Sequence, residues 1–557
     1  MKKLLYLFIF TFLSSNLLAQ TLPVGTPLLE EYYQIAHLNG ELDSTISFTV
    51  RPLSLSAAKN IFNPEDEQAS WLKWDGVKTF AHGKGKLQIL PFSWQSQYNS
   101  HHPYGWNDGS MIPAKGYQTQ VSAGIYAQWG PLSVQLRPEL VWAANKEFEG
   151  FNTEHADITW WWYYWRLLNL IDLPERFGDE IYRKASWGQS SIRLNFDPIS
   201  IGLSNENLWW GPGKRNSLIM SNNAPGFKHL TLNTIRPIKT PIGSLEGQIV
   251  AGRLESSGFL PPEPNRIAFG FPLYWPKTED WRYLSGFTLT YQPKWVPGLF
   301  LGITRVFQMY HNDMDGRLDD YIPFFQAFQK SNTSEGEKER DQLASVFAKY
   351  LLKESKAEIY FEFGRNDHSM NLRDFLMEPE HSRAYMVGFS KLFTLPKKDE
   401  FILANLEFTQ LSQANSSLIR DAGAWYVHVP VRQGYTHQGK VIGAGIGPGS
   451  NLQSMSLSWH RGLKNLGLQF ERYVHNNDFY FDAFAHSGDY RKRWVDLSMA
   501  ATAGWNYKNL LINAKFSTIR SLNYQYWLID RPWEHTFLQS GQDLFNFQGQ
   551  LGLTYRF

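Results

Sequence analysis

Aromatic side chains in dense groups are the residues of this sequence best suited to ligand chemistry. They occur as a run at 160–165, Trp-Trp-Trp-Tyr-Tyr-Trp, and as pairs at 209–210, 274–275 and 425–426. Flat rings present apolar faces to the C–H surfaces of sugars, while arginine, asparagine and histidine nearby supply hydrogen bonds to hydroxyl groups and positive charge for uronate carboxylates. This combination is typical of a site for an acidic polysaccharide. The candidate residues are Trp160, Trp161, Trp209, Trp210, Lys214, Arg215, Asn222, Asn223, Arg420, Trp425, Arg432 and His437.

A structural role for the same aromatic residues stays open. Rings of this kind also form the interfacial belt of a membrane barrel or the packed core of an external cap. Both interpretations apply to the run at 160–165 and to Trp209 and Trp210, which lie within a turn rich in glycine and proline.

Local motifs for catalysis or for a metal ion fail when their spacing is checked. A calcium loop with Gly316 at its sixth position would begin at His311 and would place Ile322 where a bidentate glutamate belongs. The glycines between 443 and 449 lack the spacing of a dinucleotide-binding loop. The sequence contains neither a G-x-S-x-G elbow nor an H-E-x-x-H pair. We therefore expect no enzymatic activity, no metal and no cofactor.

The composition excludes further classes of protein. The 557 residues include 54 Lys and Arg against 52 Asp and Glu, a balance that gives no positive field for binding nucleic acid. No cysteine is present, which excludes disulfide scaffolds and cysteine nucleophiles. Aromatic residues make up 16% of the chain although its mean hydropathy is only −0.38. Alternating strands would reconcile these two values, because each lipid-facing aromatic residue would be followed by a polar one.

The first residues have the pattern of a secretory signal peptide. Lys2 and Lys3 precede an apolar stretch and Ala19 ends a plausible cleavage site, so we expect 1–19 to be removed on export. No other segment is long and apolar enough to be a transmembrane helix. An exported chain of this kind is either soluble outside the cytoplasm or a closed barrel in a membrane.

The remaining sequence falls into two regions. In 20–76 the signals are helical, because Thr26 and Asn63 are each followed by proline and then by residues suited to a first helical turn. We expect a small helical region there. In 77–557 the period changes to two, as in 547–557, where apolar and polar residues alternate.

Eighteen segments of this alternating kind can be counted, and the connections between them alternate in length. Those at 130–131 and 507–509 are tight turns, whereas 143–186 and 412–450 are long. Long loops on one side and short turns on the other are typical of an outer-membrane barrel. We predict an 18-stranded antiparallel β-barrel, a monomer surrounded by outer-membrane lipid, whose terminal Phe557 is read by the barrel-assembly machinery.

Two motifs resemble the central signature of the capsule assembly Wzi family. The first is Asn-Leu-Trp-Trp-Gly-Pro-Gly at 207–213, and the second is Ser-Leu-Ile-Met-Ser-Asn-Asn-Ala-Pro-Gly-Phe at 217–227. Supporting stretches lie at 172–178, 362–367 and 437–443. The resemblance covers most of the chain that follows the signal peptide. It implies an eighteen-stranded outer-membrane barrel, occluded on the periplasmic side by a small helical bundle, that acts as a lectin-like protein and helps to hold capsular polysaccharide on the cell surface.

Two functions from different classes compete at this point. The first is a non-enzymatic binding protein that helps to assemble or attach capsular or extracellular polysaccharide. The alternative is an outer-membrane porin or solute channel, which Glu358, Glu362, Gln469 and Glu471 favour because the strand period points them into the lumen.

Overall fold

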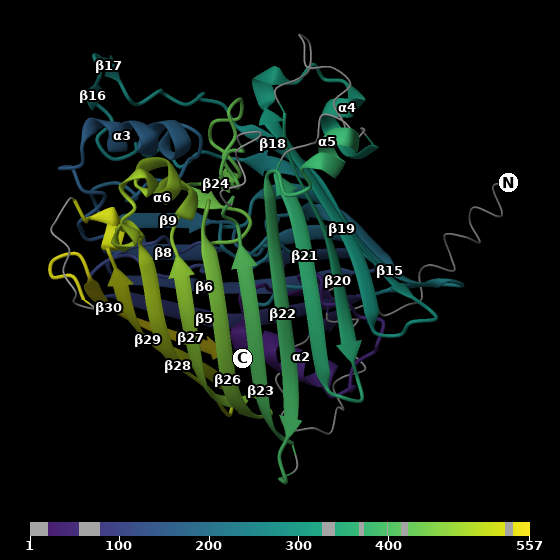
Figure 1. The fold of residues 1–557 in the computed structure, drawn as a ribbon. Coiled ribbons are helices and arrows are strands. Elements are labelled where there is room, and N and C mark those ends of the chain that lie inside the picture. Colours follow the sequence, from purple (N-terminus) through teal and green to yellow (C-terminus); the bar gives the residue numbers. More distant parts are fainter. Residues whose placement is uncertain are drawn as a thin grey trace.

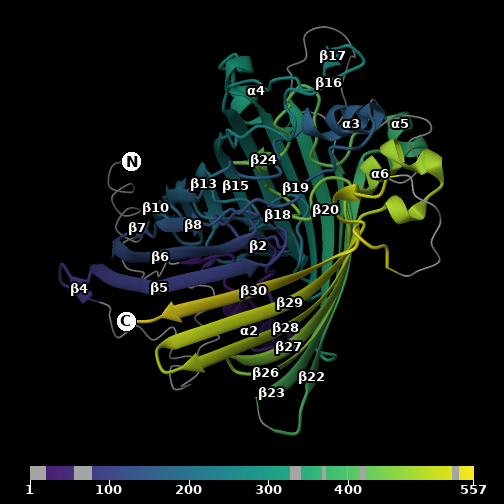
Figure 2. The same ribbon diagram turned by 90° about the vertical axis from the view of Figure 1, so that its left-hand side faces the viewer.

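The computed structural model describes residues 21–54, 78–325, 340–366, 372–397, 399–413, 422–529 and 538–557. Within them a continuous antiparallel sheet closes on itself, because β5 (Gly85–Asn99) pairs with β30 (Leu544–Tyr555) near the end of the chain. Figure 1 shows the resulting barrel from the side, and Figure 2 shows it after a quarter turn. The predicted signal peptide, the second expected helical pattern from Asn63 and Arg420 lie outside the described residues.

The barrel has 18 strands, which confirms the prediction. Two of them are interrupted, so that β7 with β8 and β9 with β10 each count as one strand, while β4 (Lys78–Phe80) and β14 (Ile238–Thr240) only extend hairpins. The remaining bounds are β6 (Gly116–Trp129), β7 (Leu132–Leu136), β8 (Glu139–Ala143), β9 (Tyr182–Ser186), β10 (Ser191–Phe196), β11 (Ile199–Ser204), β13 (Lys228–Thr234), β15 (Gly243–Leu254), β18 (Arg282–Pro293), β19 (Leu299–Tyr310), β20 (Asp341–Leu352), β21 (Ala357–Asn366), β22 (Arg383–Thr394), β23 (Glu400–Gln410), β26 (Asn451–Arg461), β27 (Lys464–Val474), β28 (Val495–Tyr507) and β29 (Leu510–Leu522).

Short and long connections lie at opposite ends of the barrel, called here the turn end and the loop end (Figure 1). At the turn end, β26 and β27 are joined by two residues, and Gly462 supplies the left-handed conformation with φ +58°. At the loop end, β8 and β9 are separated by 144–181 and β23 and β26 by 411–450. The alternation read from the sequence is therefore the real arrangement of the connections.

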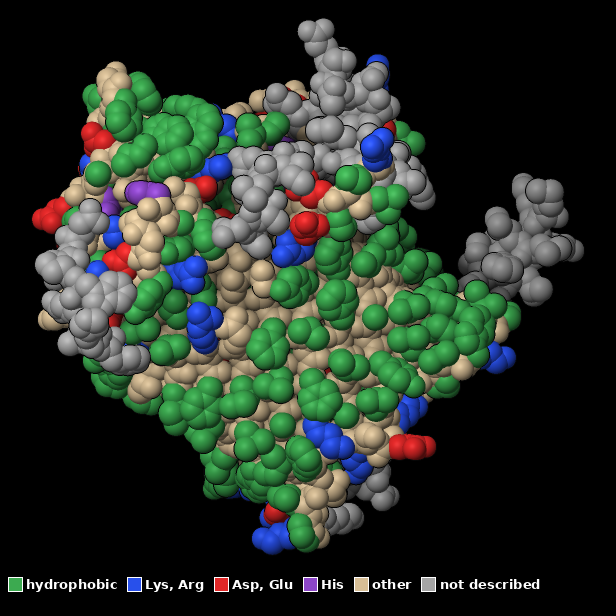
Figure 3. Space-filling model, viewed as in Figure 1, with side chains coloured by type: hydrophobic (Ala, Val, Ile, Leu, Met, Phe, Trp, Pro, Cys, Tyr) green, Lys and Arg blue, Asp and Glu red, His purple; other side chains and the backbone are tan. Residues whose placement is uncertain are grey.

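The two faces of the wall follow the strand period. In β30, Phe545, Phe547 and Leu551 are exposed, whereas Asn546 and Gln548 between them are buried and face the lumen. Figure 3 shows the outward side chains as a hydrophobic band across the face of the barrel in view. Near the turn end Trp129 and Tyr507 add to this band, as expected for an aromatic girdle at a membrane interface.

The N-terminal segment lies inside the turn end of the barrel (Figure 2). Its helix α2 (Pro27–Leu38) begins after Thr26, as predicted, and packs Ile35 and Leu38 against wall residues such as Phe300 and Leu403. Further along, β2 (Val50–Arg51) pairs with β12 (Trp209–Trp210), and β1 (Thr21–Leu22) pairs with β3 (Leu53–Ser54). The described part of the expected helical bundle is thus one helix and extended chain. No helix among the described residues is long and apolar enough to cross a membrane.

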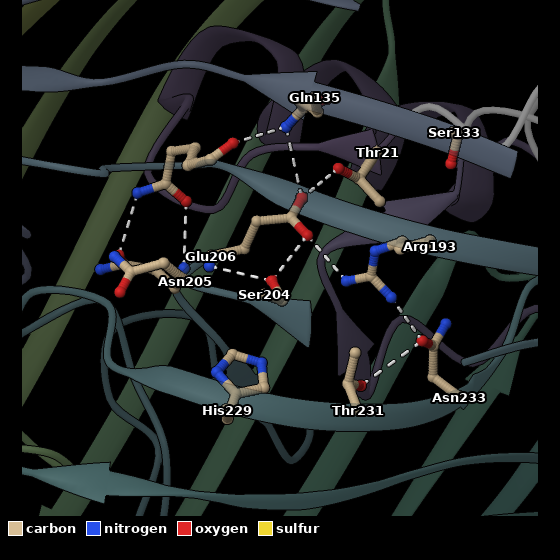
Figure 4. Close-up of polar contacts among 12 residues, drawn as sticks. Thr21, Ser133, Gln135, Arg193, Ser204, Asn205, Glu206, His229, Thr231 and Asn233 are labelled. Atoms are coloured by element: carbon tan, nitrogen blue, oxygen red, sulfur yellow. Dashed lines mark hydrogen bonds and ion pairs between the residues drawn. The ribbon is translucent and has the colours of Figure 1, made fainter. Parts of the chain in front are cut away.

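Residues 205–227, which join β11 to β13, fold into the lumen and are called here the inward loop. Its start is held by Glu206, whose carboxylate accepts hydrogen bonds from Arg193 at 2.7 Å, from Ser204 at 3.0 Å and from Thr21 (Figure 4). Its middle is held by the opposite wall, where the Glu407 carboxylate accepts the backbone N–H groups of residues 214, 215 and 216 at 2.7, 3.0 and 2.8 Å.

A hydrophobic core fills the lumen around the inward loop. Trp210, Leu218 and Ile219 of the loop pack against inward wall residues such as Leu343 and Val306 and against buried residues of the segments 104–106 and 424–446. Loop residues and wall residues form one cluster here, so packed side chains occupy the lumen at the level of the inward loop.

We expect the purified barrel to be electrically silent in a planar lipid bilayer, because loop residues and the N-terminal segment occupy its lumen. Replacing residues 209–223 with a short glycine and serine linker removes the centre of the core and is expected to raise the conductance. An open porin measured in the same bilayer is the positive control. Steady open-channel current from the unaltered protein would contradict a filled lumen.

The buried pair of Arg193 and Glu206 gives a test of how the inward loop is held. Both side chains are almost fully buried, at 4% and 1% exposure, so Glu206→Gln leaves a buried guanidinium without a countercharge. We expect the free energy of unfolding, measured by urea titration in detergent, to fall by about 3–5 kcal/mol. Arg236→Gln breaks an exposed pair of similar geometry with Asp197 and is expected to cost less than about 1 kcal/mol. Equal losses in the two variants would show that the buried pair is not what holds the loop.

Candidate functional site

A cap of long connections covers part of the loop end. It contains α3 (Asp157–Tyr163), continued by the π-helical turn η3 (Tyr164–Leu168), together with α6 (Asn477–Ala483) and the hairpin of β16 (Ile267–Ala268) and β17 (Phe271–Pro272). Figure 1 shows α3 and α6 side by side above the strands. The cap also contacts the connection 422–450, in which β24 (Thr436–His437) pairs with β25 (Lys440–Val441). Two further helices, α4 (Leu318–Tyr321) and α5 (Leu372–Met377), belong to other connections.

An aromatic cluster holds this cap together. Trp160 is fully buried and meets Phe151 edge to face at 5.0 Å, while Phe479 of α6 lies against Phe151 and Tyr526. Arg266 lies over the Trp160 ring at 4.7 Å and pairs with Asp157 in the first turn of α3. Large rings from separate connections therefore share one core, which fixes the position of α3.

Beside this core, the helix and the connection next to it present partly exposed rings. Trp161 and Trp165 are four residues apart and stack with ring centroids 5.5 Å apart and planes only 8° from parallel. Trp275 meets Trp165 edge to face at 5.4 Å, and the side chains of Trp165 and Trp275 are each 43% exposed. These three rings are called here the aromatic platform. Figure 3 shows hydrophobic side chains gathered over α3 at the loop end, where the platform lies.

Two cations cap the end of the helix that carries Trp161 and Trp165. The Lys277 ammonium donates to the carbonyl of Leu168 at 2.7 Å, and Arg432 donates to the carbonyls of Asn169, Trp275 and Pro276. Cations are favourable at this position because the last carbonyls of a helix have no partner within it. Burial lowers the pKa of Lys277 to about 8.

Arg432 retains binding capacity after these contacts. Its Nε and Nη2 atoms donate to carbonyls, its Nη1 has no hydrogen-bond partner in the described part of the chain, and no carboxylate there pairs with it. The guanidinium lies 6.0 Å from the centre of the Trp275 ring. A sugar ring stacked on the platform could therefore place a carboxylate against Arg432 and Lys277.

The predicted residues Trp209 and Trp210 lie elsewhere, in the inward loop. Trp210 is fully buried and donates from its indole nitrogen to Gln248 at 2.8 Å, and Trp209 packs beneath the Arg51 guanidinium at 4.5 Å. Trp210 has no exposed face, whereas Trp209 lines a cavity of about 390 Å³ in the lumen, together with Lys214, Arg215 and Asn222. Both tryptophans link the inward loop to the N-terminal segment.

The polar candidates of the inward loop are also engaged within the lumen. Lys214 pairs with Glu358 at 3.0 Å and Arg215 with Glu471 at 2.7 Å. Asn222 donates to the backbone carbonyl of Asn107 at 2.8 Å, while Asn223 donates to the carbonyl of Val441 at 2.8 Å. The acidic partners Glu358 and Glu471 are among the side chains that favoured a channel, and they bind the loop that fills the lumen.

Of the remaining candidates, Trp425 and His437 are buried in the same core. Trp425 donates to the Ser382 carbonyl at 2.9 Å, and the ring nitrogen of His437 accepts the backbone N–H of Glu255 at 3.0 Å. Burial lowers the pKa of His437 to about 3, so its ring is neutral and offers no charge to a carboxylate. The structure thus brings Trp161 and Arg432 together at the aromatic platform and places Trp160 directly beneath it.

Two rings of the platform, Trp165 and Trp275, and the neighbouring Lys277 were not among the sequence candidates. The stacking of Trp165 on Trp161 follows from a spacing of four on a helix, which the run at 160–165 contains. Trp275 and Lys277 lie two residues apart, and this closeness of an aromatic residue to a cation is the sequence pattern that could have identified them as site residues. That they face Trp165 depends on contacts between distant connections, which no local pattern reports.

Comparison with known proteins agrees with this architecture. A family model described as capsule assembly protein Wzi matches residues 100–520, a range that contains both motifs at 207–213 and 217–227. Among solved structures, the chain is similar to Escherichia coli Wzi, described as an outer-membrane protein involved in group 1 capsule assembly and as a carbohydrate-binding β-barrel. The identity is 14%, the match covers 97% of this chain and 100% of that chain, and the TM-score is 0.60.

Other similar structures are more distant. Pseudomonas aeruginosa OpdQ is 8% identical, with 85% of this chain and 97% of that chain covered and a TM-score of 0.39. Acinetobacter baumannii OccAB4 is 9% identical, with 84% and 97% covered and a TM-score of 0.36. No curated protein sequence matches the chain. Because the family model spans most of its length, the chain belongs to the Wzi family of capsule assembly proteins and is an outer-membrane β-barrel.

Proposed function

We propose that the chain binds acidic capsular or extracellular polysaccharide through the aromatic platform and helps to hold it on the cell surface. The observation that carries this proposal is the stack of Trp161 and Trp165 with exposed Trp275 beside it, lined by Lys277 and Arg432 at the loop end. The loop end of an outer-membrane barrel faces the cell exterior, where such a polymer lies. The carbohydrate-binding description of E. coli Wzi supports the same class of ligand.

The charge at the platform favours an acidic polymer over a neutral one. Lys277 and Arg432 both lie at the end of the helix that carries Trp161 and Trp165, and each donates to carbonyl groups that carry no full charge. A uronate carboxylate would gain charge-assisted hydrogen bonds there, which are stronger than those of a neutral hydroxyl group. Stacking would contribute affinity for sugar in general, and the two cations would select for acidic residues.

Binding without bond cleavage is part of this proposal. The described residues contain no group of three or more histidine, aspartate or glutamate side chains placed to hold a metal ion. The platform itself offers aromatic rings, an ammonium and a guanidinium, and none of these supplies a carboxylate acid and base pair for glycoside hydrolysis. A porin function gains no support from the lumen, whose acidic residues hold the inward loop.

Removing the platform rings tests the proposal directly. We expect Trp165→Ala and Trp275→Ala each to weaken retention of acidic polysaccharide by about tenfold, since a lost stacking contact of about 1.4 kcal/mol has that effect. The measurement is surface plasmon resonance on protein in detergent, with acidic and neutral polysaccharides of similar length. Trp129→Ala is the matched control, because Trp129 is an exposed tryptophan at the turn end. Unchanged binding in both platform variants would refute the platform as the site.

Arg432→Gln separates charge from stacking in the same assay. We expect it to lower affinity for the acidic polymer several-fold, as expected for loss of a charge-assisted hydrogen bond, and to leave the neutral polymer almost unaffected. A proportional loss for both polymers would instead indicate that Arg432 acts by holding Trp275 in place.

The lowered pKa of Lys277 predicts a specific pH dependence. Because this pKa is about 8, the ammonium loses its proton as the pH rises from 7 to 9, whereas an ordinary lysine would remain charged. Affinity for the acidic polymer should therefore fall over this range. In Lys277→Arg the charge persists and the fall should disappear. The same fall in wild type and in this variant would assign the pH dependence to another group.

A further inference from the structure

The outer wall near the loop end carries two arginines that face the membrane. Arg472 in β27 and Arg520 in β29 both pair with Leu497 of β28, so the three residues form one row across neighbouring strands. The arginine backbones are therefore about 10 Å apart, twice the spacing between strands, and both long side chains can reach a common point. Figure 3 shows Lys and Arg side chains over this part of the wall, above the hydrophobic band.

Within the described ranges, no carboxylate pairs with either arginine. Arg472 donates from Nη1 to the amide oxygen of Gln453 at 2.8 Å. Other outward arginines do have one, since Arg253 near the loop end of β15 pairs with Glu255 at 2.5 Å. An unpaired guanidinium beside the hydrocarbon region of a membrane is unfavourable unless an anion comes to it.

An apolar groove lies directly below this row. The next row toward the turn end consists of outward residues Met455, Phe470 and Met499, which pair in that order across β26, β27 and β28. Together the two rows line a groove of about 580 Å³, to which both arginines contribute. Its exposed side chains are methionine, leucine and phenylalanine, which suit contact with a hydrocarbon chain.

The groove continues along the wall by one further row. A second groove of about 890 Å³ is lined by Leu457, Leu468, Ala501 and Phe516, which follow in register beneath the first. From Arg472 to Leu466 the distance along β27 is about 20 Å, and less across the tilted strand. This length matches one leaflet, half of a hydrocarbon core of about 30 Å.

We propose that this surface is a binding site for a phosphorylated lipid of the outer leaflet. The phosphate lies between Arg472 and Arg520, and an acyl chain follows the groove past Met499 toward Ala501. Charge complementarity identifies the occupant. The two arginines lie at the external end of an apolar groove, and an anionic lipid likewise has a charged headgroup at the external end of an apolar chain. The site is separate from the aromatic platform and does not depend on the proposed polysaccharide function.

The test compares the full-length protein with Arg472→Gln/Arg520→Gln by native mass spectrometry in a neutral detergent. The probes are a bis-phosphorylated acylated disaccharide lipid, a zwitterionic phosphocholine lipid with chains of the same length, and the phosphorylated disaccharide without its chains. We expect the unaltered protein to bind the first probe at least about tenfold more tightly than either of the others, since charged hydrogen bonds and buried methylene groups each contribute. The double variant should lose that preference.

Arg253→Gln is the matched control, because it removes an outward arginine near the loop end that already has a carboxylate partner. It should bind the acylated probe as the unaltered protein does. Heat-modified mobility on gels verifies that each variant is a folded barrel. The proposal is overturned if the double variant retains the preference, if the phosphocholine lipid binds equally well, or if the disaccharide without chains binds as tightly as the complete lipid.

Discussion

The hydrogen bonds and ion pairs between carboxylates of the barrel wall and the inward loop are the interactions on which the rest of the structure depends. One carboxylate, Glu407, accepts the N–H groups of three successive residues and also the Tyr360 hydroxyl at 2.7 Å. A buried carboxylate needs hydrogen-bond donors, and the buried backbone N–H groups of the inward loop need acceptors. The Glu407 carboxylate and the loop backbone therefore satisfy each other. Lys214 and Arg215 then pair with Glu358 and Glu471, which fixes the middle of the loop against the far wall.

The fixed loop in turn supports the external connections. Ser221 donates to the Gly443 carbonyl at 2.6 Å and Tyr426 donates to the Leu218 carbonyl at 2.8 Å, so the connection 422–450 rests on the inward loop. Arg432 belongs to that connection and reaches the backbone of Trp275. A continuous set of contacts therefore links the acidic lining of the lumen to the aromatic platform. The same contacts occupy the lumen and position the aromatic platform at the loop end.

The sequence predicted the barrel well because its information is local. Alternation in segments such as 544–555, with tight turns and long loops in strict succession, defines strand number and the two ends without any tertiary contact. The helix at Pro27 was equally readable from its start signal. The motif around Trp209 also pointed to the correct family, and the reason for its residue types is now visible in the partners Gln248, Arg51 and Glu407.

The candidate site was predicted less well, for a physical reason. In the sequence, Trp210 and Trp165 are alike, since both lie in aromatic pairs or runs between strands. One is fully buried and the other is 43% exposed, and the difference arises from contacts with residues of other strands and connections. Of the sequence candidates, Trp161 and Arg432 lie at the aromatic platform, while most of the others that the structure describes belong to the core of the lumen.

A crystal structure of the full chain with an acidic oligosaccharide would test the central claim most directly, since it locates the ligand without relying on a variant. The account predicts a sugar ring lying parallel to the exposed face of Trp165 or Trp275, with its carboxylate against Arg432 and Lys277. A sugar bound within the lumen, against the residues of the inward loop, would contradict it.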